Sequence, residues 1–185
     1  MISLVYQNKK ILQEIKKDFK KNNILKLESF FAKSFYETLK EDCESLKYKH
    51  KKKAEKFSYS RASEESKVKS LLNSKEFQDF VSSVADKKIS SLEIKKFAHK
   101  DYAFLQESQQ NSSETKLFIF ICEKWEPDLG GNFIFTKENG QTFYLTPMEN
   151  SIAIINKQKN SREFVQYINH SSNQRKIIVI ESDLI

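Results

Sequence analysis

The spacing of hydrophobic residues divides the chain into a mainly helical first part and a strand-rich second part. In the first part, apolar residues recur three or four positions apart, which is the spacing of an amphipathic helix. We therefore expect one helix ending near Asn22, a second over residues 30–46 and a third over residues 64–84. Their apolar positions are Val5, Ile11, Leu12, Ile15 and Phe19; Phe30, Phe31, Phe35, Leu39, Cys43 and Leu46; and Leu71, Leu72, Phe77, Phe80, Val81 and Val84.

The pattern changes between the second and third of these helices. Residues 47–62 read KYKHKKKAEKFSYSRA, with six lysines between positions 47 and 56 and then aromatic residues alternating with serines. Such alternation is typical of strands. We expect a basic, strand-like segment over residues 47–61. Its lysines are expected to form a solvated face, and binding of a polyanion is the less favoured interpretation.

From residue 87 onward, short apolar runs alternate with turn signals. All three glycines and both prolines lie after residue 126, and these residue types mark turns. About seven or eight short strands, spaced at about 8–12 residues, are typical of a sandwich or jelly roll. We predict an α+β protein with one domain, residues 1–185. In it, a mainly helical part (residues 1–86) packs against a jelly-roll core (residues 87–185) of the double-stranded β-helix type.

Composition narrows the class of protein. Hydrophobic residues make up 38% and charged residues 31%, which suits a globular protein with a solvated surface. The longest apolar run, LFIFIC, is far shorter than the roughly 18 residues of a membrane span, and the N-terminus lacks the apolar segment of a secretory signal. Cys43 and Cys122 form no CxxC pair. We expect free buried thiols in a reducing, cytoplasmic compartment.

The net charge of +7 is carried almost entirely by lysine, because the chain has only three arginines. A basic surface attracts nucleic acid or acidic proteins. However, arginine is the preferred residue for contacts to phosphates and bases, and no RNA-binding motif is recognisable. Direct nucleic-acid binding through the lysine-rich segment is therefore the least favoured function.

Candidate chemistry is concentrated in FAHKDYAF, residues 97–104. His99 and Asp101 are two positions apart, and on a strand such residues share a face, so both could reach one metal ion. Tyr102 follows them and could line a pocket, although a core position is the favoured interpretation. His50, within KHKKK, is expected to be exposed.

The order of features after residue 75 resembles the 2-oxoglutarate- and Fe(II)-dependent oxygenases, in their prolyl-hydroxylase-like branch. That branch has HxD, a buried strand ending in Trp, a Gly-Gly strand, a P-x-x-N turn, a strand with H-x-V-x-x-V, and an Arg that begins the last strand. The resemblance covers residues 75–182. The matching positions are His99, Asp101, Trp125, Gly130, Gly131, Pro147, Asn150, Val165, Ile168 and Arg175.

This resemblance implies a dioxygenase that hydroxylates a protein or peptide side chain with Fe(II) and 2-oxoglutarate as cofactors. Non-haem Fe(II) of this class is held by two histidines and one carboxylate. His99 and Asp101 would supply two ligands. Arg175 would hold the distal carboxylate of 2-oxoglutarate, because a planar guanidinium suits that group. A target associated with the ribosome or with nucleic acid would suit the basic charge.

The third iron ligand departs from the family pattern. Aligning Val165 and Ile168 on H-x-V-x-x-V places Glu163 where the distal histidine belongs. His170 lies seven residues further on, and at about 3.3 Å per residue it would reach the other end of the barrel, so it ranks below Glu163. If neither completes the site, the alternative is a catalytically inactive jelly-roll relative that serves as a protein-interaction module.

Overall fold

The computed structural model describes residues 1–63, 66–104 and 114–185. Four helices belong to the N-terminal part. They are α1 (Lys9–Asn22), α2 (Lys33–Ser45), α3 (Ser66–Leu72) and α4 (Lys75–Ala85). Short 3-10 helices occur in both parts of the chain: η1 (Leu4–Gln7), η2 (Pro127–Leu129) and η3 (His170–Ser172). No helix in the described part of the chain is long and apolar enough to cross a membrane.

Local chemistry sets where two of these helices begin and end. The side chain of Asn8 accepts a hydrogen bond from the backbone N–H of Lys10, and α1 ends where Asn23 adopts a left-handed conformation. The hydroxyl of Ser74 likewise accepts from Phe77, and α4 ends at the left-handed Asp86. Capping side chains satisfy backbone groups that a helix end leaves unpaired, and a left-handed residue terminates the helix.

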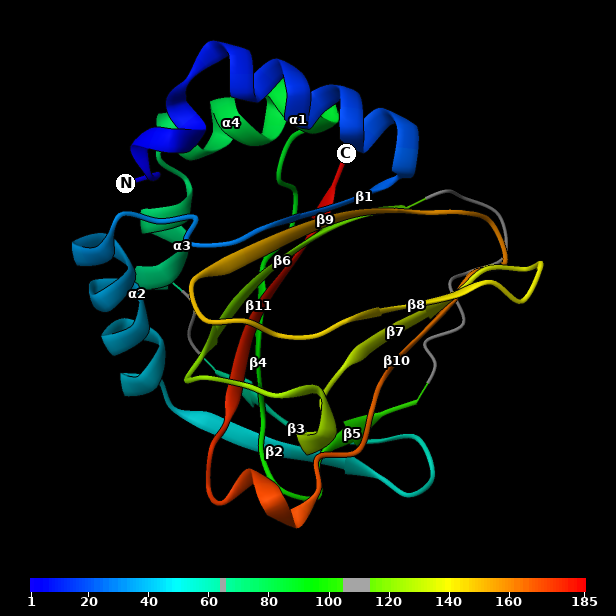
Figure 1. The fold of residues 1–185 in the computed structure, drawn as a ribbon. Helices are drawn as coiled ribbons and strands as arrows, with labels where there is room; N and C mark the ends of the chain where they lie inside the picture. Colours follow the sequence, from blue (N-terminus) through cyan, green and yellow to red (C-terminus); the bar gives the residue numbers. More distant parts are fainter. Residues whose placement is uncertain (64–65, 105–113) are drawn as a thin grey trace.

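The strands form one strongly curled antiparallel sheet (Figure 1). Its order is β1-β9-β6-β11-β4-β3-β5-β10-β7-β8, with β2 paired to β3. The bounds are β1 (Ile24–Leu27), β2 (Tyr48–Lys53), β3 (Phe57–Ala62), β4 (Glu93–Phe97), β5 (Tyr102–Ala103), β6 (Glu114–Cys122), β7 (Phe133–Thr136), β8 (Thr142–Leu145), β9 (Ser151–Lys157), β10 (Arg162–Val165) and β11 (Ile177–Leu184).

This sheet folds into two facing layers. The larger layer contains β1, β9, β6, β11 and β4, and the smaller contains β5, β10, β7 and β8. Strand β3 joins them, since Ser60 and Arg61 pair with β4 while Phe57 and Ser58 pair with β5. The helices lie on the outer side of the larger layer (Figure 1). The expected double-stranded β-helix with N-terminal helices is confirmed.

Two hydrophobic cores follow from the alternation of side chains along the strands. On β6, Leu117, Ile119 and Ile121 belong to the core shared with the helices. Phe118 and Phe120, on the other face of the same strand, belong to a second core inside the barrel. The run LFIFIC is apolar throughout because both of its faces are buried.

The basic segment expected over residues 47–61 is the hairpin β2–β3. The second helix begins at Lys33, later than expected, so Phe30 and Phe31 precede it. Both side chains pack in the core, with 4.9 Å between their ring centroids. Asn150, from the turn after Pro147, holds this segment through hydrogen bonds to the backbone N–H and C=O of Phe31.

Candidate functional site

His99 and Lys100 form the turn between β4 and β5, and not a strand. Lys100 has φ +72°, a left-handed conformation, and the backbone N–H of Asp101 donates to the carbonyl of Ala98 at 2.9 Å. The expectation that His99 and Asp101 share one face of a strand is therefore corrected. Because of this turn, the two side chains have different environments. The side chain of His99 is exposed, and the side chain of Asp101 is buried.

Asp101 ties this turn to strand β3. One carboxylate oxygen accepts a hydrogen bond from Ser58 Oγ at 2.6 Å, and the other accepts from the backbone N–H of Ala98 at 3.0 Å. The side chain is only 6% exposed. A buried carboxylate needs such donors, because burial without them is costly. These contacts give Asp101 a structural role in joining the two layers of the barrel.

Glu163 lies at the other end of the smaller layer from this turn. On the β5–β10 ladder, Ala103 faces Val165. Because these strands are antiparallel, Asp101, two residues before Ala103, lies beside the residues that follow Val165. Glu163 lies on the other side of Val165, two residues before it. About four residues of extended chain separate the two positions, or roughly 13 Å. Among the described residues, no three His, Cys, Asp or Glu side chains are placed to hold a metal ion. The structure does not bring His99, Asp101 and Glu163 together.

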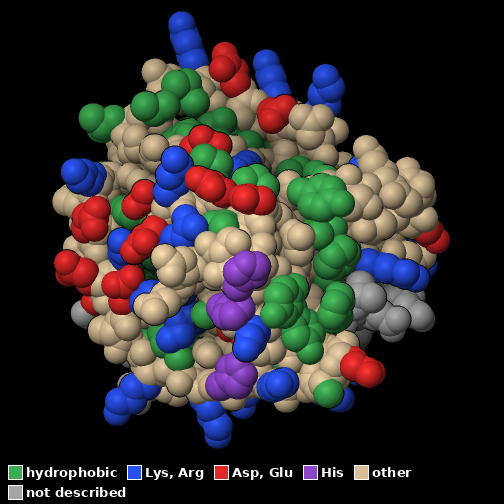
Figure 2. All heavy atoms as spheres, turned by 60° about the horizontal axis from the view of Figure 1, so that its bottom comes forward, with side chains coloured by type: hydrophobic (Ala, Val, Ile, Leu, Met, Phe, Trp, Pro, Cys, Tyr) green, Lys and Arg blue, Asp and Glu red, His purple; other side chains and the backbone are tan. Residues whose placement is uncertain are grey.

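The three histidines lie on one face of the molecule. Figure 2 shows them grouped at the end of the barrel that lies at the bottom of Figure 1. They come from β2 (His50), from the β4–β5 turn (His99) and from η3 (His170). His170 is exposed on η3. No histidine lines the barrel cavity described below.

Arg175 holds a loop at the same end. Its guanidinium donates to three backbone carbonyls, those of Ser172 (3.1 Å), Lys124 (3.1 Å) and Ser171 (3.3 Å). The assignment of Arg175 to 2-oxoglutarate remains a prediction, and in this conformation most of its donors are already used. Tyr102 packs against Phe104, with 5.2 Å between ring centroids. Its neighbour Ala103, and not Tyr102, lines the barrel cavity.

That cavity lies between the two layers of the barrel. Aromatic rings of Phe57, Tyr59, Phe97 and Phe133 form much of its wall, and Lys95, Glu163 and Glu181 contribute charge. Its volume is about 50 Å³. A pocket for a small organic ligand typically measures about 300 Å³ or more, so this cavity accommodates a few water molecules.

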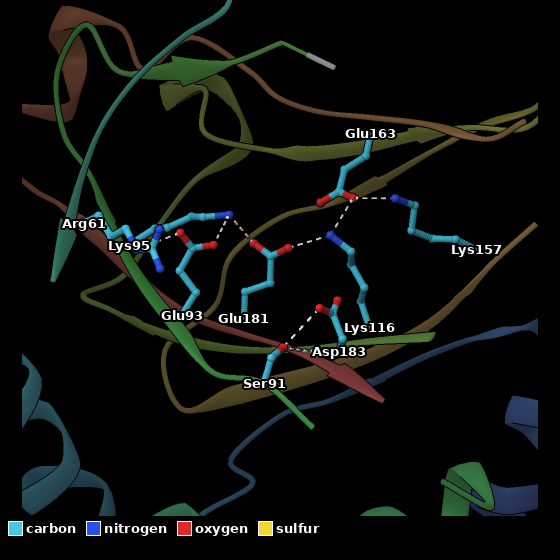
Figure 3. A network of polar contacts seen from close by, with 9 residues as sticks. All are labelled: Arg61, Ser91, Glu93, Lys95, Lys116, Lys157, Glu163, Glu181 and Asp183. Carbon is cyan, nitrogen blue, oxygen red and sulfur yellow. Dashed lines mark hydrogen bonds and ion pairs between the residues drawn. The ribbon is translucent and has the colours of Figure 1, made fainter. Parts of the chain in front are cut away.

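A network of ion pairs occupies one end of the barrel (Figure 3). Glu181 on β11 accepts from both Lys95 Nζ and Lys116 Nζ at 2.6 Å. Lys116 Nζ lies 3.5 Å from Glu163, and Lys157 Nζ lies 2.9 Å from the same carboxylate. All five side chains are between 3% and 12% exposed. At the rim, Glu93 pairs with Lys95 and Arg61, and Glu114 pairs with Lys157.

The strand alternation explains why these charges meet. Along each inward-facing row, which takes every second residue, apolar side chains give way to charged ones toward one end of the strand. All of these charged ends lie at the same end of the barrel. The rows are Ile177, Val179 and Glu181 on β11; Phe120, Phe118 and Lys116 on β6; Phe97, Lys95 and Glu93 on β4; Ala153, Ile155 and Lys157 on β9; and Val165 and Glu163 on β10.

The network keeps its members charged despite burial. For Lys95 and Lys116, burial by itself lowers the pKa, but the neighbouring carboxylates outweigh it and raise the pKa above the usual lysine value. For Glu181, burial raises the pKa, but Lys95 and Lys116 outweigh it and lower the pKa to about 2. An opposite charge within hydrogen-bonding distance favours the ionised form in this way.

The described residues do not fit the iron and 2-oxoglutarate that the family pattern implies. Glu163, at the position of the distal histidine, contacts two lysines, and Asp101 holds the β4–β5 turn roughly 13 Å away. The inward lysines that could receive a carboxylate already hold Glu181. Sequence reasoning missed this network. The available signal was a charged residue two positions beyond each run of inward apolar ones.

Comparison with known proteins gives distant likenesses. No family model matches the chain. Among curated proteins it is similar to prolyl 3-hydroxylase OGFOD1 of Mus musculus, 28% identical over 83 residues, and of Xenopus laevis, 27% identical over 88 residues. The match covers 43% and 45% of this chain but only 15% and 17% of those proteins, so the chain corresponds to a small part of their length.

Solved structures match over nearly the whole chain. A Pseudomonas putida prolyl-4-hydroxylase has TM-score 0.69 and 10% identity, covering 94% of this chain and 98% of that one. A Trichoplax adhaerens prolyl hydroxylase, in complex with a hypoxia inducible factor peptide, has TM-score 0.71 and 8% identity, covering 97% and 91%. These likenesses show the fold. The curated relatives and both of these structural neighbours are named as prolyl hydroxylases, in agreement with the resemblance that the sequence carries.

Proposed function

We propose that this chain, a divergent relative of the prolyl-hydroxylase-like 2-oxoglutarate oxygenases, binds a protein or peptide segment at the mouth of its barrel without using an iron centre. The observation that carries this proposal is the ion-pair network of Lys95, Lys116, Lys157, Glu163 and Glu181. It includes Glu163, the residue that the family pattern aligns with the distal iron ligand.

The energetics of the network oppose its conversion into a metal site. For Glu163 to bind a metal ion, its carboxylate would have to turn away from Lys157 and Lys116, which are 3% and 8% exposed. These ammonium groups would then lose a partner while still buried. Removing one partner from a buried ion pair typically costs about 3–5 kcal/mol. The network is therefore better suited to stabilise the barrel than to release a ligand.

The barrel mouth retains features suited to a peptide. Phe57, Phe104 and Phe164 line the cavity at this end, and the ring of Phe104 is 52% exposed. Aromatic side chains are enriched where proteins bind one another. The Trichoplax neighbour is itself a complex with a peptide, which supports a peptide-sized partner for this surface.

The second candidate function is hydroxylation of a protein or peptide side chain with Fe(II) and 2-oxoglutarate. The likeness to prolyl 3-hydroxylases favours it. In this function His99, Asp101 and Glu163 would remain the predicted ligands and Arg175 the predicted 2-oxoglutarate residue. Iron would then activate oxygen, and the described side chains would have to rearrange before they could converge.

One experiment separates the two functions. The full chain is titrated anaerobically with Mn(II), which replaces Fe(II) without turnover, together with 2-oxoglutarate, and heat is measured by calorimetry. Our proposal expects no saturable binding and no conversion of 2-oxoglutarate to succinate when Fe(II) and oxygen are supplied. Stoichiometric Mn(II) binding that disappears in His99→Ala but persists in the matched surface variant His50→Ala would overturn it.

A further inference from the structure

Strand β2 is an edge strand with an unusual charge. Among the described residues it pairs only with β3, so its outer edge has no strand partner. Five of its six residues are exposed. In Figure 1 it lies at the bottom of the molecule, and the same end, brought forward in Figure 2, carries many Lys and Arg side chains around the histidines.

The lysines of β2 differ from those inside the barrel in having no carboxylate partner within the part of the chain that the structure describes. Lys49, Lys51, Lys52 and Lys53 form no ion pair with a carboxylate of the described residues, whereas Lys95 and Lys116 each contact two carboxylates. Unpaired, adjacent ammonium groups repel one another and attract an anion. The positive charge of this strand is therefore available to a partner.

Both faces of the strand are cationic. Lys49, Lys51 and Lys53 lie directly opposite Arg61, Tyr59 and Phe57 of β3, and residues opposite each other in a ladder project to the same face. This face is the one on which Tyr59 and Phe57 line the barrel cavity. His50 and Lys52 lie opposite Ser60 and Ser58, on the other face.

We propose that the outer edge of β2 binds an extended acidic peptide as an additional strand, with its carboxylates paired to Lys49, Lys51, Lys52 and Lys53. The inference rests on the proposed peptide-binding function, names its partner class, and extends the binding surface from the barrel mouth to β2, whose Lys53 lies opposite Phe57 of the mouth. Peptides commonly add to exposed sheet edges, where the backbone gives affinity and alternate side chains give specificity. Here the backbone edge and the charges lie along the same six residues.

The positive charge of β2 also disfavours pairing of its outer edge with a basic or a neutral strand. Lysines on an edge prevent two such edges from pairing, because like charges would face each other. A neutral strand would leave the ammonium groups beside it without partners. An acidic strand removes the repulsion among them, so the same residues that block self-association favour this one class of partner.

The observations favour a peptide over nucleic acid. Strand β2 contains no arginine, which is the preferred residue for phosphates. Its single tyrosine, Tyr48, has Lys96 Nζ over its ring at 4.1 Å from the centroid. That ring is therefore not free to stack on a base, as single-stranded nucleic acids require.

The test uses the full chain and fluorescently labelled peptides of strand length, about six to eight residues. In one peptide glutamate alternates with threonine, and in the control lysine replaces glutamate. We expect the acidic peptide to bind with an affinity that falls as salt is added, and the basic peptide not to bind. Lys51→Glu combined with Lys53→Glu is expected to weaken binding by at least about tenfold.

A matched variant and a modified peptide make the outcome decisive. Lys10→Glu combined with Lys17→Glu changes the net charge equally on the exposed side of α1, and it should change the affinity by less than about twofold. An acidic peptide with alternate amides N-methylated keeps its charge but cannot complete a ladder. It should bind poorly, and hydrogen exchange should show protection of residues 48–53 only with the unmodified peptide.

Three results would overturn the inference. They are equal binding of the N-methylated peptide, equal weakening by the α1 variant, and preferential binding of a single-stranded oligonucleotide through Lys51 and Lys53. None of these measurements involves iron or 2-oxoglutarate. A positive Mn(II) titration would therefore reject the proposed iron-free function while leaving the β2 site standing, and loss of the β2 site would leave the metal result unaffected.

Discussion

Lysine has opposite roles at two places in this molecule. Inside the barrel, Lys95, Lys116 and Lys157 are between 3% and 11% exposed and each contacts carboxylates. On β2, Lys51 and Lys53 are exposed and unpaired with any carboxylate of the described residues. The two groups lie on neighbouring parts of the same curled sheet, because β3 joins β2 to β4.

The difference shows that environment, and not residue type, assigns the role. A buried ammonium group is tolerated only when carboxylates replace the water it has lost. The interior lysines therefore have a structural role and are not available to bind a partner. An exposed ammonium group keeps its water, contributes little to stability, and remains available for a partner. The interior group should be sensitive to mutation and to pH, and the exposed group should be sensitive only to ligand.

The largest effect is expected when Glu181 is removed. Glu181→Ala leaves Lys95 and Lys116 buried with fewer carboxylates, and should lower the free energy of unfolding by about 3–5 kcal/mol. Urea denaturation followed by circular dichroism measures it. The matched variant Glu14→Ala, on the exposed side of α1, should change stability by less than about 0.5 kcal/mol. Similar values for the two variants would show that the network contributes little.

Acid should weaken the same network. The pKa of Glu181 is lowered from 4.5 to about 2 in the folded chain. A carboxyl with a depressed pKa contributes stability that is fully present above its unfolded value, near pH 4.5, and that is lost as the pH falls through the folded value. We expect a loss on the order of 3 kcal/mol between these limits. It should be measurable by denaturation at successive pH values.

The Glu181→Gln variant provides the control for the acid effect. It cannot titrate at this position, so its stability should fall less steeply between pH 4.5 and pH 2 than that of the natural chain. Parallel curves for the two proteins would assign the acid sensitivity to other carboxylates and would contradict the role given to Glu181.

An intermediate effect is expected at the β4–β5 turn. Asp101→Ala leaves Ser58 Oγ and the N–H of Ala98 without their acceptor, which should cost about 1–3 kcal/mol. His99→Ala should cost less than about 0.5 kcal/mol, because that side chain is exposed. Thermal denaturation of both variants tests this. If His99→Ala were as destabilising as Asp101→Ala, the two residues would share a role that this geometry does not provide.

The smallest effect on stability is expected on β2. Lys51→Ala combined with Lys53→Ala removes two exposed charges, and the free energy of unfolding should change by less than about 0.5 kcal/mol. Relief of repulsion between neighbouring lysines could even make the change slightly favourable. A loss of more than about 1 kcal/mol in urea denaturation would show that these lysines are structural, like those inside the barrel.

The sequence by itself determined the order and type of most elements. The periodicity of apolar residues located three helical regions and the strand series, because helices and strands bury faces with different spacing. The glycines and prolines marked the turns of the second part. The regular spacing of the short strands was sufficient to predict the double-stranded β-helix that the structure has.

The tertiary structure alone decided what the polar residues do. The letters H-K-D do not reveal that Lys100 adopts a left-handed conformation, which turns a same-face pair into one exposed and one buried side chain. Nor do they reveal that Glu163 lies beside Lys116 and Lys157, which come from different strands and are 47 and 6 positions away. Periodicity records which face of an element is buried. Which charges meet on that face depends on register and curvature across strands that are distant in sequence.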